Sequence, residues 1–352
     1  MKSESFSGVD IHYFTGTGNA RSVSGWFMEE ARKQGLDGKI IYIGNNDADI
    51  PSPEEDQLIG ICSPTHGFNF PPVVIKYLFR FPKGRNRVFI INTRAGMKLW
   101  KIPLVGLSGP AQLFSALILR CKGYRIVGMK PIDLPSNWLS LHPGLREKVI
   151  VSLFDRCEKQ TREFAGRILS GKRGYRALLD LVQDILAIPL AIAYYFIGRF
   201  VLAKSFVASS NCTMCGKCVR NCPVKAIKVI DNRPFWTFKC ESCMKCMNEC
   251  PERAIQTAHG LVIGSLYLLM TVGMEMLYLG LYRWIPEDTI PGFLHNGFVE
   301  FVIVSALCIP FLWLSYRIVH LLMRFRFFER MVVLTSLTFY KWWRRYRGIK
   351  TI

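Results

Sequence analysis

The first half of the chain alternates between short apolar runs and longer stretches of mixed polarity. The apolar runs lie at residues 9–14, 39–44, 57–63, 87–93 and 124–135. Helix-like stretches separate or follow several of them, at residues 72–80, 107–122 and 144–169. Strands that alternate with helices favour a parallel sheet with helices on both faces. We therefore predict an α/β domain with a doubly wound parallel sheet over residues 1–172.

A glycine-rich loop separates the first apolar run from a helix-like segment at residues 21–33. It reads Thr15, Gly16, Thr17, Gly18, Asn19. Glycines let the backbone approach a phosphate, while successive N–H groups, hydroxyls and a helix N-terminus favour its charge. The loop matches neither the dinucleotide pattern nor a Walker loop. Because ligands bind at the carboxyl ends of strands in such sheets, the loops at 63–70 and 92–96 should share its crevice.

Hydrophobic residues return in a segment that joins the first domain to the next. Its uninterrupted apolar part, residues 185–198, is about 14 residues long, whereas a spanning helix needs about 20. Pro189 lies within it. We therefore interpret residues 173–204 as a linker whose helix lies along a membrane surface or packs between domains.

Two longer apolar runs occur near the C-terminus, at 261–282 and 298–316. A nearly neutral connection joins them, and a strongly basic segment follows. We predict a two-helix transmembrane hairpin over 259–323 and a basic cytoplasmic tail over 324–352, because positive charge marks the cytoplasmic side. The alternative is a pair of buried helices in a soluble domain.

One carboxylic acid, Glu275, falls within the first of these apolar runs. An ionisable group inside a bilayer is costly, so a functional role is the first hypothesis. Glu275 would protonate a quinone or pair with a partner subunit. Alternatively, it is a protonated side chain hydrogen-bonded within the hairpin.

Eight of the twelve cysteines form two quartets, each followed by a proline. They are Cys212, Cys215, Cys218 and Cys222, then Cys240, Cys243, Cys246 and Cys250. Each quartet has the C-x2-C-x2-C-x3-C-P spacing of bacterial ferredoxins, in which the fourth cysteine ligates the other cluster. We predict an α+β ferredoxin-like domain over 205–258 with two [4Fe–4S] clusters, where Cys250 joins the first three cysteines and Cys222 joins the second three. A zinc ribbon or a disulfide scaffold is the alternative.

The formal net charge of +20 raises the question of nucleic-acid binding. Much of the excess flanks apolar segments instead, and the cluster thiolates are counted as neutral although a bound cluster is negative. We expect no nucleic acid as a partner. A basic surface of this kind attracts acidic lipid headgroups or an acidic electron carrier.

The motifs together carry a resemblance over residues 1 to about 258. The loop at 15–19, the segment SPTHGFNFPP at 63–72, the GLSGPA segment at 106–111 and the paired quartets are similar to flavodoxin–ferredoxin fusion proteins. The resemblance implies a flavodoxin-like fold, FMN and intramolecular electron transfer. Thr15, Gly16, Thr17, Gly18 and Asn19 would hold the FMN phosphate. The residues that would edge the flavin ring are Pro64, Thr65, His66, Gly67, Phe68, Thr93, Arg94, Ala95 and Gly96. The alternative is a flavodoxin-like fold that has lost its flavin.

These observations support one main functional hypothesis and two others. The first is a membrane-anchored protein that passes electrons between two [4Fe–4S] clusters, FMN and unidentified redox partners, with both redox domains facing the cytoplasm. The second is a membrane reductase of a quinone or another lipophilic substrate, in which His66 or Glu275 supplies protons. The third is an electron-delivery module for a membrane enzyme.

Overall fold

The computed structural model describes residues 6–44, 50–99, 102–268, 271 and 297–346. Its first domain contains a six-stranded sheet with the order β2-β1-β3-β4-β7-β8. The strands are β1 (Val9–Tyr13), β2 (Gly38–Tyr42), β3 (Leu58–Pro64), β4 (Arg87–Thr93), β7 (Arg125–Ile132) and β8 (Gly174–Tyr175). All neighbours are parallel. The first five follow the flavodoxin-like order, so the prediction of a doubly wound parallel sheet is confirmed.

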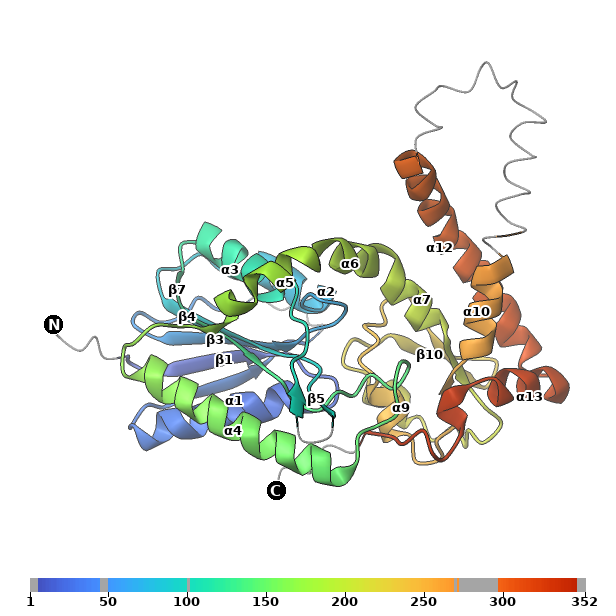
Figure 1. The fold of residues 1–352 in the computed structure, drawn as a ribbon, viewed down its shortest axis with the longest axis horizontal. Helices are drawn as coiled ribbons and strands as arrows, with labels where there is room; N and C mark the ends of the chain where they lie inside the picture. The colour runs from blue at the N-terminus through green and yellow to red at the C-terminus, as the bar shows by residue number, and fades with distance from the viewer. Residues whose placement is uncertain (1–5, 45–49, 100–101, 269–270, 272–296, 347–352) are drawn as a thin grey trace, which may run out of the picture.

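Four helices cover the two faces of this sheet (Figure 1). Helices α1 (Asn19–Lys33) and α4 (Glu147–Leu169) lie together on one face, and α2 (Pro72–Arg80) and α3 (Ala111–Cys121) lie on the other. Strands β3 and β4 are buried on both faces, as their continuous apolar sequences require. Between sheet and helix, the rings of Phe27 and Phe89 stack with centroids 4.0 Å apart. A short hairpin, β5 (Met97–Leu99) and β6 (Ile102–Leu104), follows β4 and was not predicted.

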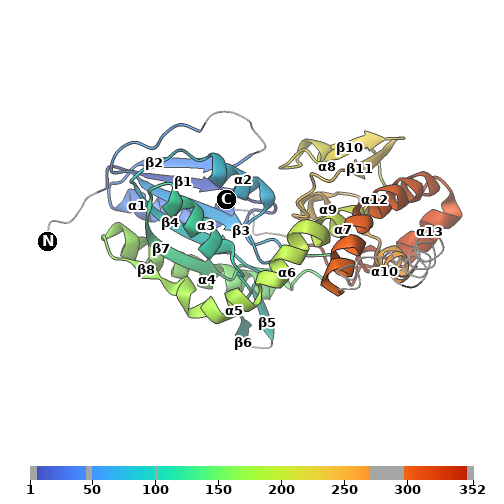
Figure 2. The ribbon, with the colours of Figure 1, turned by 90° about the horizontal axis from the view of Figure 1, so that it is seen from above.

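A helical linker runs from the first domain to the second along one side of the molecule (Figures 1 and 2). It comprises η1 (Arg176–Asp180), α5 (Leu181–Leu186), α6 (Ile188–Ala193), the π-helical η2 (Tyr194–Gly198) and α7 (Arg199–Lys204). The linker bends by 72° between Leu186 and Ile188. Pro189 lies in the first turn of α6, where it has no N–H to donate to the carbonyl of Ile185, so α5 does not continue through it as one straight helix.

The second domain is a small α+β unit with an internal repeat. It pairs β9 (Phe206–Ala208) with β12 (Ile255–Thr257), and β10 (Ile227–Ile230) with β11 (Arg233–Trp236), both antiparallel. Two short helices, α8 (Lys217–Arg220) and α9 (Lys245–Glu249), each lie within one cysteine quartet. Asp231 and Asn232 have positive φ angles, which the two-residue turn between β10 and β11 requires.

The C-terminal part contains α10 (His259–Leu268), α12 (Gly297–Leu322), α13 (Arg326–Leu334) and η6 (Leu337–Phe339). Most of the predicted first span, with Glu275, lies outside the described residues. Among the residues that are described, no single helix combines the length and apolar composition of a membrane span, whereas Arg176–Leu186 and Ile188–Lys204 do so as a bent pair. The transmembrane hairpin stays a prediction.

The segment expected as a basic tail is folded against both domains as far as Tyr346. Trp343 and Tyr346 are 6% and 3% exposed. The indole nitrogen of Trp343 donates to the carbonyl of Leu139 in the first domain at 2.7 Å. The hydroxyl of Thr338 accepts from the backbone of Thr257 at 2.9 Å in the second domain. This packing returns the chain to the junction between the domains.

Candidate functional site

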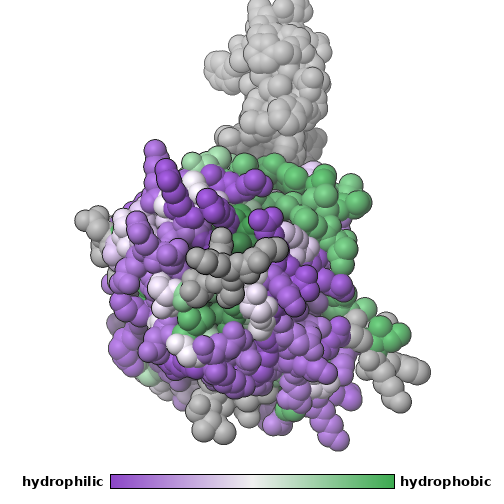
Figure 3. Space-filling model, turned by 90° about the vertical axis from the view of Figure 1, so that its left-hand side faces the viewer, coloured by the Kyte–Doolittle hydropathy of each residue, from purple (hydrophilic) through white to green (hydrophobic). Residues whose placement is uncertain are grey.

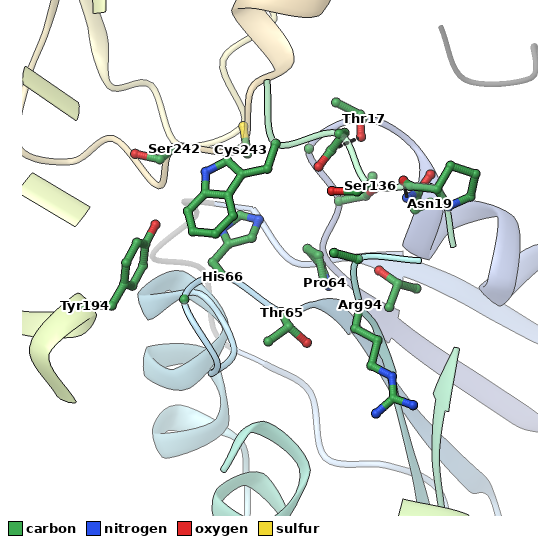
Figure 4. A pocket seen from close by; sticks show the side chains of 18 residues that line it. Thr17, Asn19, Pro64, Thr65, His66, Arg94, Ser136, Tyr194, Ser242 and Cys243 are labelled. Carbon is green, nitrogen blue, oxygen red and sulfur yellow. Dashed lines mark hydrogen bonds between the residues drawn. The ribbon is translucent and has the colours of Figure 1, made fainter. Parts of the chain in front are cut away.

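The loops at the carboxyl ends of the parallel strands surround one cavity, whose empty volume, including the space open to solvent, is about 590 Å³ (Figure 4). The predicted residues that line it are Thr15, Gly16, Thr17, Asn19, Pro64, Thr65, His66, Gly67, Thr93, Arg94 and Ala95. The structure adds Pro135, Ser136, Asn137, Trp138, Tyr194, Ser242 and Cys243. The last two belong to the second domain, so the cavity lies where the two domains meet.

Three of the predicted residues, Gly18, Phe68 and Gly96, do not line this cavity. Gly18 has a φ of 108° and shapes the turn into α1, while its N–H donates to the Thr15 hydroxyl at 3.0 Å. Gly96 donates its N–H to the carbonyl of Leu134 at 2.7 Å, which holds two loops of the cavity together. These glycines therefore shape the loops.

Two side chains of the glycine-rich loop are already bound to protein groups. The amide of Asn19 donates to the carbonyl of Pro135 at 3.1 Å and accepts from the hydroxyl of Tyr346 at 2.7 Å. The hydroxyl of Thr17 accepts a hydrogen bond from the amide of Asn137. Because the Thr17 hydroxyl only accepts in that bond, it keeps its own O–H to donate, and this loop offers that hydroxyl and the backbone N–H groups at the start of α1 to a phosphate.

Two aromatic side chains form cavity walls that the sequence analysis missed. Trp138 follows β7, and Tyr194 comes from the linker; their ring centroids lie 6.1 Å apart in an edge-to-face arrangement. A Cβ atom at Gly67 would lie 2.0 Å from the Tyr194 ring, so a glycine is needed there. The sequence did contain a signal for Trp138. Its loop follows a strand parallel to the others, and the loops after parallel strands meet at the same edge of the sheet.

His66 lies inside the junction and is neutral at pH 7, because burial lowers the pKa of its imidazole to about 4. Its Nδ1 is buried and has no protein hydrogen-bond partner. A neutral imidazole can hold or pass on one proton through hydrogen bonds, but it does not offer a resident positive charge.

The guanidinium of Arg94 points away from His66 and Tyr194 (Figure 4). It forms ion pairs with Asp133 at 2.6 Å and with Asp180 at 2.7 Å. The sequence analysis expected Arg94 beside a flavin ring. In the structure its charge fastens the linker to the sheet, and only the rest of the residue borders the cavity.

The eight quartet cysteines gather in the second domain as two groups of four. Cys218 interacts electrostatically with Cys212, Cys215 and Cys250. Cys246 does so with Cys240, Cys243 and Cys222. The fourth cysteine of each quartet therefore lies with the first three of the other, which is the exchange that the spacing predicts.

Burial, and to a lesser extent the neighbouring thiols, keeps some of these thiols protonated in the absence of a cation. Burial, with the neighbouring thiols, raises the pKa of Cys218 to about 11 and that of Cys243 to about 12. Metal binding deprotonates such thiols. Within the described residues no group of His, Cys, Asp or Glu is placed to hold a single metal ion, whereas a cubane spreads its four thiolates over separate corners. The donor set fits a [4Fe–4S] cluster.

The glycine-rich loop touches the second cysteine quartet directly. A Cβ atom at Gly16 would lie 2.6 Å from the Cβ and 3.2 Å from the Sγ of Cys243. Figure 4 shows Ser242 and Cys243 entering from the second domain, opposite Pro64 and Thr65. The two candidate cofactor sites thus share a wall.

Comparison with protein families finds one match, to a 4Fe-4S binding domain, over residues 207–228. This match includes the first cysteine quartet. No curated protein matches the chain. The chain therefore combines a flavodoxin-like sheet with a 4Fe-4S binding domain.

Solved structures that resemble the chain include a flavodoxin from the domain Archaea, with 13% identity, coverage of 46% of this chain and 98% of that chain, and a TM-score of 0.28. A flavodoxin from Megasphaera elsdenii has 13% identity, coverage of 45% and 98%, and a TM-score of 0.26. A flavone reductase has 11% identity, coverage of 80% and 99%, and a TM-score of 0.30. TM-scores this low do not establish a shared fold, so the assignment of the first domain rests on its strand order.

Proposed function

We propose that this chain is an electron-transfer protein in which FMN in the interdomain cavity exchanges electrons with two [4Fe–4S] clusters. One observation carries the proposal: the cavity is lined by the glycine-rich loop on one side and by Cys243 on the other. FMN supplies one-electron and two-electron chemistry, and the clusters supply one-electron steps.

The residues of the cavity have distinct roles in this proposal. The backbone of residues 15–19 and the N-terminus of α1 bind the phosphate. Trp138 and Tyr194 orient the flavin ring and exclude water, because both are aromatic walls of the cavity. His66 stays neutral and holds a proton by hydrogen bonding.

The cysteines hold the clusters in two sets, with Cys222 and Cys250 exchanged between the quartets. The set that contains Cys243 borders the flavin cavity. The other set contains Cys215, which is exposed. The proposal therefore places one cluster beside the flavin and the other near the surface, where a redox partner protein can approach.

Membrane association is part of the proposal. Large apolar side chains are exposed along the linker, including Leu179 at 70%, Val182 at 74% and Leu186 at 73%. Figure 3 shows apolar side chains gathered at the top of the molecule, where α5 and α6 lie in Figure 1. The linker would rest on the lipid surface, and the 259–323 hairpin would cross it with both redox domains on the cytoplasmic side.

A second cavity favours another candidate function, reduction of a quinone or a similar lipophilic compound. It lies between α7, α10 and α12 and is open to solvent. Leu261, Leu266 and Phe311 contribute apolar walls, while Lys204 and Tyr316 contribute polar groups. Apolar walls with a few polar groups are the usual lining of a site for a lipophilic ligand.

Cofactor analysis after anaerobic purification in lipid tests the main proposal. We expect about eight irons, eight sulfides and one FMN per chain, and dithionite should reduce both kinds of centre. Zinc in place of iron, or intact clusters without flavin, would contradict it. Reoxidation of the reduced protein by a soluble acidic carrier, but not by a quinone, would favour electron transfer over the reductase.

A further inference from the structure

The C-terminal segment 340–346 is held at the junction of the two domains by both its backbone and its side chains. The N–H of Gly144 donates to the carbonyl of Arg344 at 2.7 Å, and the guanidinium of Arg344 donates back to Gly144 at 2.9 Å. The N–H of Tyr346 donates to the side chain of Asn248, within the second quartet, at 2.8 Å. The residue between these anchors, Arg345, has a fixed position.

Arg345 directs its guanidinium into the second domain. Its Nη2 donates to the carbonyl of Ile255 at 2.8 Å and to the side-chain oxygen of Gln256 at 3.2 Å. Its Nε and Nη1 are buried and have no hydrogen-bond partner in the protein. Charged donor atoms that are buried without a partner are costly, so a partner outside the protein atoms is expected.

The surroundings of Arg345 indicate what that partner is. Its guanidinium interacts electrostatically with Cys246 and Cys250, which belong to different cysteine groups. Burial lowers the pKa of Arg345 to about 10, so the side chain remains charged at neutral pH. The positive charge, together with that of the nearby Arg253, therefore lies within electrostatic reach of both predicted clusters.

We propose that Arg345 donates hydrogen bonds from its unpaired Nε and Nη1 to sulfur atoms of the two clusters and thereby raises their reduction potentials. This inference rests on the proposed clusters. A cluster with four thiolates is negative, and it becomes more negative by one charge when it accepts one electron without making or breaking a bond. A fixed cation nearby favours the reduced form, and hydrogen bonds to the sulfurs act in the same direction.

Redox titration of the full chain, monitored by EPR, tests the proposal in the variants Arg345→Gln and Arg345→Lys. At the wild-type midpoint potential, Arg345→Gln should lower the reduced-to-oxidised ratio of the clusters by about tenfold, equivalent to 59 mV for a one-electron couple. Arg345→Lys should give a smaller change, because it keeps the charge but loses the planar set of donors.

Lys341→Gln is the matched control, because Lys341 is an exposed residue of the same segment and the same charge is removed. It should leave both potentials close to the wild-type values. Unchanged potentials in Arg345→Gln at full iron content would overturn the proposal, as would an equal shift in Lys341→Gln. Iron and sulfide analysis of the wild type separates this result from failure of the proposed function.

A measurement on the unmodified sequence covers the case in which Arg345→Gln loses its clusters. Protein labelled with ¹⁵N in its arginine guanidinium groups should show ¹⁵N coupling in pulsed EPR spectra of the reduced clusters. Arg345→Lys should remove that coupling. Its absence from the wild type would show that Arg345 does not bond to cluster sulfur.

Discussion

Gly16 serves both sides of the domain junction. As part of the phosphate loop it permits close approach of the backbone to a ligand, which the sequence already indicated. The structure gives a second reason, because its missing Cβ makes room for the Cβ and the carbonyl of Cys243, at 2.6 and 2.8 Å from where a Cβ would stand. One small residue thus sets the separation between two candidate cofactor sites.

Gly16→Ala should displace the second cysteine quartet, because contacts below about 3.0 Å force backbone to move. We expect iron and sulfide content to fall toward that of one cluster, with weaker FMN retention. Both are measured on anaerobically purified protein. Gly25→Ala is the control: nothing lies within 4 Å of its missing Cβ in α1, and the change should stabilise the helix by about 0.5–1 kcal/mol. Full iron content in Gly16→Ala would contradict the proposed contact.

His12 carries a pH-dependent part of the stability. Burial lowers the pKa of its imidazole from 6.5 to about 4, and its Nδ1 lies 2.7 Å from the hydroxyl of Tyr77. The unfolded chain therefore binds the proton more readily, so this contribution is complete above pH 6.5 and is lost as the pH falls toward 4. At pH 5 the loss is about 2 kcal/mol, from 1.36 kcal/mol per pKa unit.

His12→Gln should reduce the loss of stability between pH 7 and pH 5 by about 2 kcal/mol. Gln keeps a polar partner for Tyr77 without a titrating group. Thermal unfolding of both proteins at the two pH values provides the comparison. Parallel pH dependence of wild type and variant would show that His12 stays accessible to protons in the folded chain.

At the scale of the elements, sequence reasoning succeeded where the signal is local. The parallel strands are continuous apolar runs. The spacing of the cysteines indicates which of them share a cluster, because three ligands of each cluster lie on one short loop. Sequence reasoning failed where the role of a residue depends on an element that is distant in the sequence. Tyr194 reaches the cavity only because the linker folds back over Gly67, and Arg345 reaches the cysteines only because the C-terminal segment returns.

The linker is fastened to the sheet by a buried ion pair. Arg94 has a side chain only 4% exposed, and its Nη1 lies 2.7 Å from Oδ2 of Asp180 in η1. Local sequence could not indicate this pairing, because the two residues are 86 positions apart. Removing one partner from such a pair leaves a buried charge with less compensation.

Asp180→Ala should loosen η1 and α5 by about 1–3 kcal/mol, the cost of an unsatisfied buried group. Hydrogen exchange in residues 176–186 should accelerate, by about tenfold for every 1.4 kcal/mol. Asp231→Asn is the control, because it keeps a residue suited to the turn while removing an ion pair with Arg324 whose side chains are 40% and 53% exposed, and such pairs contribute little. Equal hydrogen-exchange protection of residues 176–186 in both variants would show that the Arg94–Asp180 ion pair does not hold the linker to the sheet.

At the scale of the whole molecule, the candidate flavin cavity belongs to neither domain alone. The first domain supplies the phosphate loop and Trp138, the linker supplies Tyr194, and the second domain supplies Ser242 and Cys243. The C-terminal Tyr346 donates to Asn19 in that loop. FMN retention should therefore depend on residues remote from the flavodoxin-like sheet, and it should report on the assembly of the full chain.

Tyr194→Leu in the full chain should weaken FMN binding by about 10- to 100-fold, since loss of an aromatic wall costs about 1–3 kcal/mol. The matched control is Tyr195→Leu, because the neighbouring ring packs against Arg199 with its cation 4.8 Å from the ring centroid and does not line the cavity. FMN dissociation, followed by the recovery of flavin fluorescence on release, measures both. The iron content should stay unchanged in each, so that a difference reflects the cavity and not the clusters. If Tyr195→Leu released FMN as fast as Tyr194→Leu, the linker would act only by holding the domains together. If neither variant did so, the flavin would be bound by the first domain alone.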